Sequence, residues 1–186
     1  MGLTVQFDLA DEDLEHFRGL MQSVCARTDC RARQRIAATA DQLVARLRAT
    51  RAPQYVLRRL DTIETLIAMS RDEEWQLPED EAERVSYALA YFSESGDLIP
   101  DDTPGIGYLD DAIMIELVAQ ELRHEIDAYR DFCRFRDAET ARRAAAARDE
   151  PVTRRDWLDA KRSELQQRMR RESRGLGSLF SLFTPG

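Results

Sequence analysis

The stretch from Ala112 to Ala119 constrains the fold of this chain most, because Glu116 is the only polar residue within it. Apolar residues at helical spacing continue around this stretch from about residue 109 to 135. A helix that is apolar on nearly all sides belongs in the interior of a bundle. The sequence therefore predicts an all-α helical bundle with a central apolar helix at 109–135. Its charged second half is expected to project toward the surface, and the Ala/Arg-rich residues 136–150 either extend it or form a linker.

Five further helices are predicted from apolar residues that recur every three to four positions. Pro53 suits the first turn of one helix, and Thr153 followed by Asp156 resembles a capping box that opens the last one. Together with the central helix they make a single domain of about six helices over residues 1–174. The five helices are expected at about 11–28, 31–50, 53–71, 79–93 and 153–174.

Residues 3–9 show the alternation of apolar with polar or small side chains that is typical of a strand. No second strand pattern exists to pair with it. We expect either an extended arm packed on the helices or a strand that pairs between subunits. Trp75 and Trp157 are isolated in the sequence and are expected to be anchors in the core or at an interface.

The charge of the chain is divided unevenly. Residues 1–133 hold 14 basic and 27 acidic side chains, a net charge of −13, whereas residues 134–174 hold 13 basic and 8 acidic side chains, a net charge of +5. This division indicates either a basic partner-binding arm on an acidic body or two segments that neutralise each other within the fold or across a dimer. We expect no nucleic acid as a partner, because an acidic body repels phosphate.

An aspartate-rich segment, residues 97–111, precedes the central helix, and its motif resembles a known family signature. It is similar to the signature of the YkvA-like family, a bacterial domain of unknown function with the pattern D-x-I-P-D-x-x-P-x-x-G-x-x-D-D. The resemblance covers about residues 85–125 and implies a small helical domain, with no activity attached to it. The pattern is filled without a gap by Asp97, Ile99, Pro100, Asp101, Pro104, Gly107, Asp110 and Asp111.

Five carboxylates within fifteen residues must be compensated, since close unpaired carboxylates repel each other. In one interpretation they cap helices and form turns, with Asp110 and Asp111 accepting N–H groups in the first turn of the central helix. In a second, they form an acidic rim around exposed Ile106 and Tyr108 that docks a basic partner. In a third, they hold a divalent cation, although the spacing is not that of an EF-hand. The candidate binding residues are Asp97, Asp101, Asp102, Tyr108, Asp110 and Asp111, and the candidate cation ligands are Asp97, Asp101, Asp110 and Asp111.

Glu121 and His124 form a Glu-x-x-His motif, which in helical bundles contributes to di-iron sites. The other histidine, His16, follows Asp13 in an imperfect counterpart. The competing interpretation is a solvated charged face, because polar residues follow one stripe of this helix. No phosphate-binding loop, zinc-finger spacing or nucleophile elbow is present, so we do not expect an enzyme or a cofactor, a divalent cation excepted. The stripe consists of Glu116, Gln120, Arg123, Asp127 and Arg130.

The last twelve residues carry no charged side chain, so residues 175–186 form an apolar tail that needs a burial site. It is expected to pack on its own chain, to contact a partner or second subunit, or to lie on a membrane surface. The candidate contact residues are Leu176, Leu179, Phe180, Leu182 and Phe183.

The three cysteines, Cys25, Cys30 and Cys133, are odd in number and lack C-x-x-C spacing, which indicates reduced, buried thiols and a cytoplasmic location. No apolar run approaches the length of a membrane span, and the first residues do not resemble a signal peptide. The sequence thus predicts a non-catalytic protein-interaction or regulatory module, expected as a homodimer, with the 97–111 loop and the tail as contact surfaces. The alternatives are a divalent-metal-binding protein or metal-dependent enzyme that uses this loop, and a peripheral membrane protein.

Overall fold

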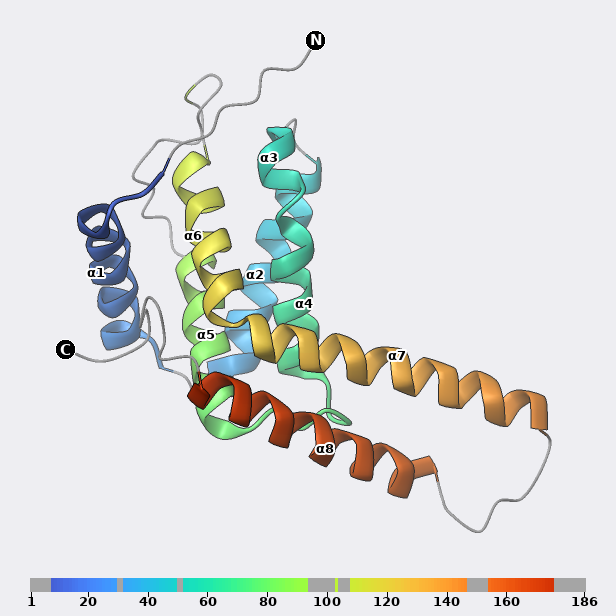
Figure 1. Cartoon of the computed structure of the whole chain (residues 1–186). Coiled ribbons are helices and arrows are strands. Elements are labelled where there is room, and N and C mark those ends of the chain that lie inside the picture. Colours follow the sequence, from blue (N-terminus) through green and yellow to red (C-terminus); the bar gives the residue numbers. More distant parts are fainter. Residues whose placement is uncertain are drawn as a thin grey trace.

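The computed structural model describes residues 8–29, 32–49, 52–93, 103, 108–146 and 154–175, and the regular structure among them is helical. The prediction of an all-α helical bundle is confirmed (Figure 1). In chain order the helices are α1 (Asp11–Arg27), α2 (Arg33–Ala49), α3 (Gln54–Leu57), α4 (Leu60–Arg71), α5 (Glu79–Ser93), α6 (Leu109–Glu121), α7 (Arg123–Ala146) and α8 (Arg154–Gly175).

The core lies between α2, α4, α5 and α6. Helix α5 contacts α1, α2 and α4, while α6 contacts α3, α4 and α7. The apolar character of α6 has the predicted consequence, because its side chains are buried on most sides of the helix. The fully buried side chains on which the packing rests are large, and they include Met21, Leu60, Leu66, Leu89, Met114 and Leu122.

The prediction of one continuous helix over 109–135 is wrong. The helix bends sharply at Leu122, where α6 ends and α7 begins in a new direction (Figure 1). The backbone of Leu122 has φ −97° and ψ 18°, outside the helical region. Leu122 is nonetheless completely buried, so the bend places one apolar segment in the bundle and the next against α8. No proline or glycine marks the break, which is therefore a product of tertiary packing.

The helix predicted at 53–71 is also divided. It consists of the short helix α3 and of α4, with a tight turn at Arg58 and Arg59 between them. The N–H of Arg59 donates to the carbonyl of Val56 over 2.8 Å, an i to i−3 bond that tightens the backbone. Val56 and Leu60 are buried on either side, so the apolar periodicity that suggested one helix serves the core across the turn.

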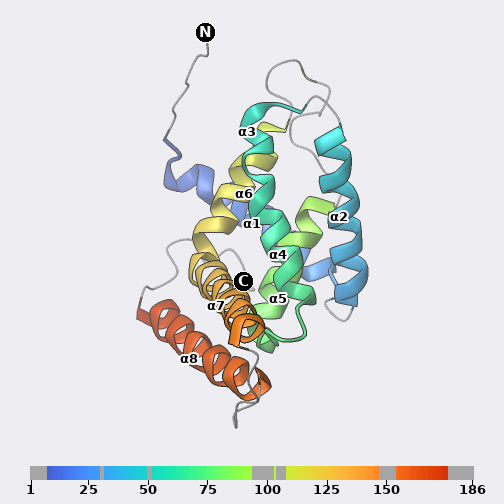
Figure 2. The same ribbon diagram turned by 90° about the vertical axis from the view of Figure 1, so that its right-hand side faces the viewer.

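Helices α7 and α8 form an antiparallel hairpin, here called the α7–α8 hairpin, that runs away from α1–α6 (Figures 1 and 2). The Ala/Arg-rich residues extend the helix as far as Ala146, which confirms one of the two expectations for them. Within the hairpin, the ammonium of Lys161 lies 5.8 Å from the ring centre of Phe135. The apolar stripe of α8 is buried as predicted, at Leu158, Leu165 and Met169.

Several smaller predictions meet mixed outcomes. Trp75 is completely buried, whereas Trp157 is 43% exposed and stands on the surface. Cys25 and Cys133 form no disulfide among the described residues and pack half-buried against the core. Of the predicted strand only Asp8 and Leu9 are described, and Leu9 packs on the core, while Cys30 and the rest of the strand lie outside the described residues. In the part of the chain that the structure describes, no helix is long and apolar enough to cross a membrane.

Candidate functional site

Most of the residues predicted for binding lie outside the described residues. Tyr108, Asp110 and Asp111 are described and stand at the start of α6. The binding of a partner or a cation by the acidic loop is therefore a prediction from the sequence. So is the contact of the tail with a subunit or a membrane. The undescribed candidates are Asp97, Asp101, Asp102, Leu176, Leu179, Phe180, Leu182 and Phe183.

The start of α6 is anchored in the body of the protein. Tyr108 has a left-handed backbone with φ 67°, which is strained for a residue with a side chain, and its carbonyl accepts the N–H of Ala112 over 3.0 Å. Its side chain packs half-buried against the core, so Tyr108 is less exposed than the docking interpretation expected. Asp110 is 4% exposed, and burial together with the charge of Asp110 raises the pKa of Tyr55 on α3.

Two residues of the acidic loop thus lie at positions that agree with a role as helix-capping side chains. Asp110 and Asp111 occupy the first turn of α6, where the helix dipole favours negative charge. The cation interpretation needs Asp97 and Asp101, which are not described. Among the described residues, no three His, Cys, Asp or Glu side chains are grouped as a metal ion would require.

The Glu-x-x-His motif lies apart from the exposed polar stripe and makes contacts within the chain. The five-residue polar stripe is exposed along its whole length, as predicted. Glu121 and His124, however, lie off that stripe: the Glu121 side chain is buried, and Nδ1 of His124 is 3.2 Å from Oε2 of Glu172 on α8. The motif instead supplies polar contacts at the bend between α6 and α7.

Arg84 on α5 is the centre of that polar contact. Its Nη1 lies 2.5 Å from Oε1 of Glu125, a side chain that is 1% exposed. Its Nη2 donates to the main-chain carbonyl of Glu121 over 3.3 Å and lies 3.5 Å from the carboxylate of the same residue. A helix break leaves main-chain carbonyls without an intrahelical hydrogen bond. The Arg84 guanidinium donates to one of these carbonyls and thereby holds the bend in place. We call Arg84, Glu81, Glu121 and Glu125 the Arg84 cluster.

Burial dominates the chemistry of the Arg84 cluster. It raises the pKa of Glu125, an effect that Arg84 offsets in part and that the nearby charge of Glu81 reinforces. Glu81 also lies 3.7 Å from Nε of Arg170, so α8 is attached to the same cluster. The arrangement joins α5, the bend and α8.

A second polar centre, Asp72, lies in the turn after α4. Its Oδ2 accepts the hydroxyl of Tyr129 over 3.0 Å and Nη1 of Arg136 over 2.6 Å, both from α7. Its Oδ1 accepts the backbone N–H groups of Glu74 and Trp75 over 2.9 and 3.1 Å. Burial raises the pKa of Asp72, but Arg136, the N–H of Trp75 and the Tyr129 hydroxyl outweigh it, so the pKa lies below its usual range.

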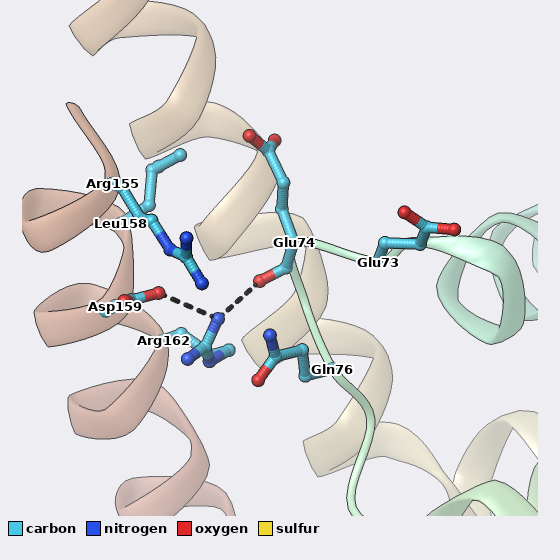
Figure 3. Close-up of a pocket in the computed structure, with 7 residues that line it drawn as sticks. All are labelled: Glu73, Glu74, Gln76, Arg155, Leu158, Asp159 and Arg162. Atoms are coloured by element: carbon cyan, nitrogen blue, oxygen red, sulfur yellow. Dashed lines mark hydrogen bonds and ion pairs between the residues drawn. The ribbon is translucent and has the colours of Figure 1, made fainter.

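Next to this turn lies an open groove of about 540 Å³, which we call the charged groove (Figure 3). One wall is the turn after α4 and the other is the first half of α8. Nη1 of Arg162 bridges the walls, at 2.9 Å from the carbonyl of Glu74 and 3.0 Å from Oδ1 of Asp159. The lining residues are Glu73, Glu74, Gln76, Arg155, Leu158, Asp159 and Arg162.

The turn after α4 contains a residue with an unusual backbone conformation, and contacts with α8 hold it. Gln76 has φ 49°, in the left-handed region that side-chain-bearing residues rarely adopt. The side-chain amide of Gln166 on α8 donates to the carbonyls of Trp75 and Gln76 over 2.9 and 3.1 Å. The surrounding contacts thus hold a conformation that the turn would not favour alone.

Sequence reasoning did not find the charged groove or its residues. The division of charge was the one available signal, because the acidic wall precedes residue 134 and the basic wall follows it. Ion pairs between the two segments bear out the interpretation in which they neutralise each other in part. Arg168 pairs with Asp131, Arg170 with Glu81, and Arg136 with Asp72.

Comparison with known proteins gives one result for part of the chain. Residues 85–117 match a family described as a protein of unknown function (DUF1232). No curated protein and no solved structure matches.

The DUF1232 segment runs from within α5 to within α6 and includes the aspartate-rich residues 97–111. It contains the anchored start of α6. The charged groove, Asp72 and the α7–α8 hairpin all lie outside it, so they are features of this chain that the DUF1232 match does not cover.

Proposed function

We propose that this chain is a non-catalytic protein-interaction module whose contact surface includes the outer face of the α7–α8 hairpin. The observation that carries the proposal is Trp157, a large apolar side chain that is 43% exposed near the start of α8, in the hairpin that projects from the bundle. Tryptophan is enriched among the residues that dominate binding at interfaces, because it buries a large area with few rotatable bonds.

The surroundings of Trp157 support the same proposal. Lys161, one helical turn further along α8, lies over the ring of the half-buried Phe135 of α7. Trp157 and Lys161 therefore share a face of the hairpin, and Lys161 is paired there with Glu164 over 2.9 Å. The face combines apolar area with charged groups, as protein interfaces do at their core and rim.

The polar groups along the inner side of α8 support a structural role for that side. Arg162 and Gln166 donate to main-chain carbonyls of the turn after α4, and Arg136 is held by Asp72. These contacts fix the direction of the hairpin relative to the bundle. The YkvA-like resemblance is compatible with the DUF1232 match, and the acidic loop, the tail and the cytoplasmic location stay in the proposal on sequence evidence alone.

A photoreactive amino acid at position 157 tests the proposal. In an extract of the source cells, irradiation is expected to give a discrete crosslinked product. The same amino acid at Gln42, an exposed position on α2, is the control and is expected to give none. An excess of unlabelled wild-type protein should suppress the product, whereas an excess of the Trp157→Ala variant should not. Equal products at both positions, or equal competition by both proteins, would contradict the proposal.

The alternative of a divalent cation in the 97–111 loop rests on its five aspartates. A cation that binds the folded state alone raises the melting temperature, with a stabilisation of about 2.7 kcal/mol at a hundredfold excess over its Kd. Thermal melts of metal-free protein with and without Mg²⁺, Ca²⁺ or Mn²⁺ measure this. A shift that Asp101→Asn abolishes would favour the metal-binding function, and the absence of a shift would exclude it.

A further inference from the structure

The charged groove lies on a different flank of α8 from Trp157. At about 100° per residue, Arg155 and Arg162 share a face of the helix, and Trp157 is roughly 200° away from Arg155. The two surfaces can therefore be occupied independently. What the groove receives can be argued from its charges.

Most charges of the groove are already paired within the chain. Arg162 pairs with Asp159, and the carboxylate of Glu74 lies 3.2 Å from Nη1 of Arg136. The remaining two are Glu73 and Arg155, which are both exposed and have no ion pair with another described residue. In Figure 3 Arg155 points into the groove from α8, while Glu73 stands on the turn with its carboxylate directed away from α8.

We infer that the groove is a contact between two copies of this chain related by a two-fold axis. In a two-fold interface the same patch meets itself, so that residue i contacts residue j and residue j contacts residue i. Counted over the described residues, the patch has one unpaired base on one wall and one unpaired acid on the other, so it is complementary to itself after such a rotation. Arg155 of each copy then meets Glu73 of the other, and both charges are compensated.

A surface of one sign would match the groove less well. A purely basic partner would satisfy Glu73 but face Arg155, and a purely acidic partner would do the reverse, with like charges adding a cost. The second copy meets both walls at once. The dimer is expected to be weak and dynamic, since two exposed ion pairs contribute little each and the groove is small compared with a stable interface.

Charge reversal with complementation tests this inference. Each copy contributes its residue to two symmetric contacts, so Arg155→Glu alone places like charges in both, as does Glu73→Arg alone. In a mixture of the two variants, each contact regains opposite charges. Sedimentation velocity over a concentration series should show a monomer–dimer equilibrium for the wild type, a dimerisation constant weakened at least about tenfold for each variant, and recovery in the mixture.

The matched control is Arg46→Glu, which changes the net charge by the same amount at an exposed position on α2. It is expected to leave the dimerisation constant unchanged. A wild type that stays monomeric throughout the series, or variants that dimerise as strongly as the wild type, would overturn the inference. The crosslinking result at position 157 would be unaffected, so the failure of this inference and that of the proposed function can be told apart.

Discussion

The carboxylate of Asp72 fastens the turn after α4 to α7 through both of its oxygens. One oxygen shapes the turn by accepting two backbone N–H groups, and the other receives the Tyr129 hydroxyl and the Arg136 guanidinium. Trp75, at the end of the same turn, is completely buried against Phe132 with ring centres 5.2 Å apart. The turn is thereby held by a polar and an apolar contact at once.

Replacing Asp72 with Ala should lower the free energy of unfolding by about 3 kcal/mol, because it removes the shorter of the two carboxylate contacts of a partly buried guanidinium and the side-chain acceptor of two backbone N–H groups. Urea denaturation followed by circular dichroism measures the change. Asp61→Ala is the comparison: Asp61 pairs with Arg48 but its side chain is 75% exposed, so its loss should cost less than about 0.5 kcal/mol. Similar losses for both variants would show that Asp72 does not have this role.

The role of Asp72 and its partners could not be predicted from the sequence. Asp72 stands in a run of charged residues, Arg71 to Glu74, that looks like an ordinary solvated turn. Its partners Tyr129 and Arg136 are 57 and 64 positions away, and only the folded chain brings them together. By contrast, burial of Trp75 was among the expectations, since a large apolar side chain needs a place in the core.

At the scale of elements, helix existence was predictable and helix continuity was not. The apolar repeat correctly indicated α1, α2, α5 and α8 nearly to their ends, because each buries one stripe. It failed at Leu122 and at Arg58–Arg59, where the apolar pattern continues through a change of direction. A segment that is apolar on nearly all sides has no single buried face, so its sequence does not show where it stops packing on one set of helices and starts packing on another. The bend at Leu122 could therefore not be predicted from the local sequence.

The raised pKa of Glu125 in the Arg84 cluster should make the free energy of unfolding depend on pH. The raised pKa of Glu125 means that burial disfavours its charged form in the folded state. Its contribution to stability is therefore fully present below the unfolded-state pKa of about 4.3 and is lost as the pH rises through the folded-state value. Glu125→Gln removes this loss. The free energy of unfolding of the variant, taken relative to that of the wild type, should therefore increase between pH 5 and pH 8.

Glu139→Gln is the matched control for that experiment. Arg142 and Arg143 lower the pKa of Glu139 to about 2, so its stabilising effect is present above the unfolded-state pKa and is lost only as the pH falls toward 2. The deficit of this variant should thus stay constant between pH 5 and pH 8. Parallel pH profiles for the two variants in urea titrations would contradict the role assigned to Glu125.

For the molecule as a whole, the uneven charge of the sequence has a structural meaning. The described residues of the net positive segment 134–174 lie in the α7–α8 hairpin, and two of its arginines pair outside the hairpin, Arg136 with Asp72 and Arg170 with Glu81. The composition indicated that the two segments neutralise each other, but it left open whether the ion pairs form within one chain or between two. The structure describes the pairs within the chain, and Glu73 and Arg155, which have no ion pair among the described residues, carry the proposed contact between chains.

The two tryptophans of the chain stand in opposite environments, one sealed beneath the turn after α4 and one open on α8. Intrinsic fluorescence therefore contains a component shielded from soluble quenchers and a component that such quenchers reach. Loss of the shielded component follows the opening of the bundle, while changes in the accessible one follow what happens on the outer face of the hairpin. The protein thus carries separate built-in optical probes for its folding and for its encounters with other molecules.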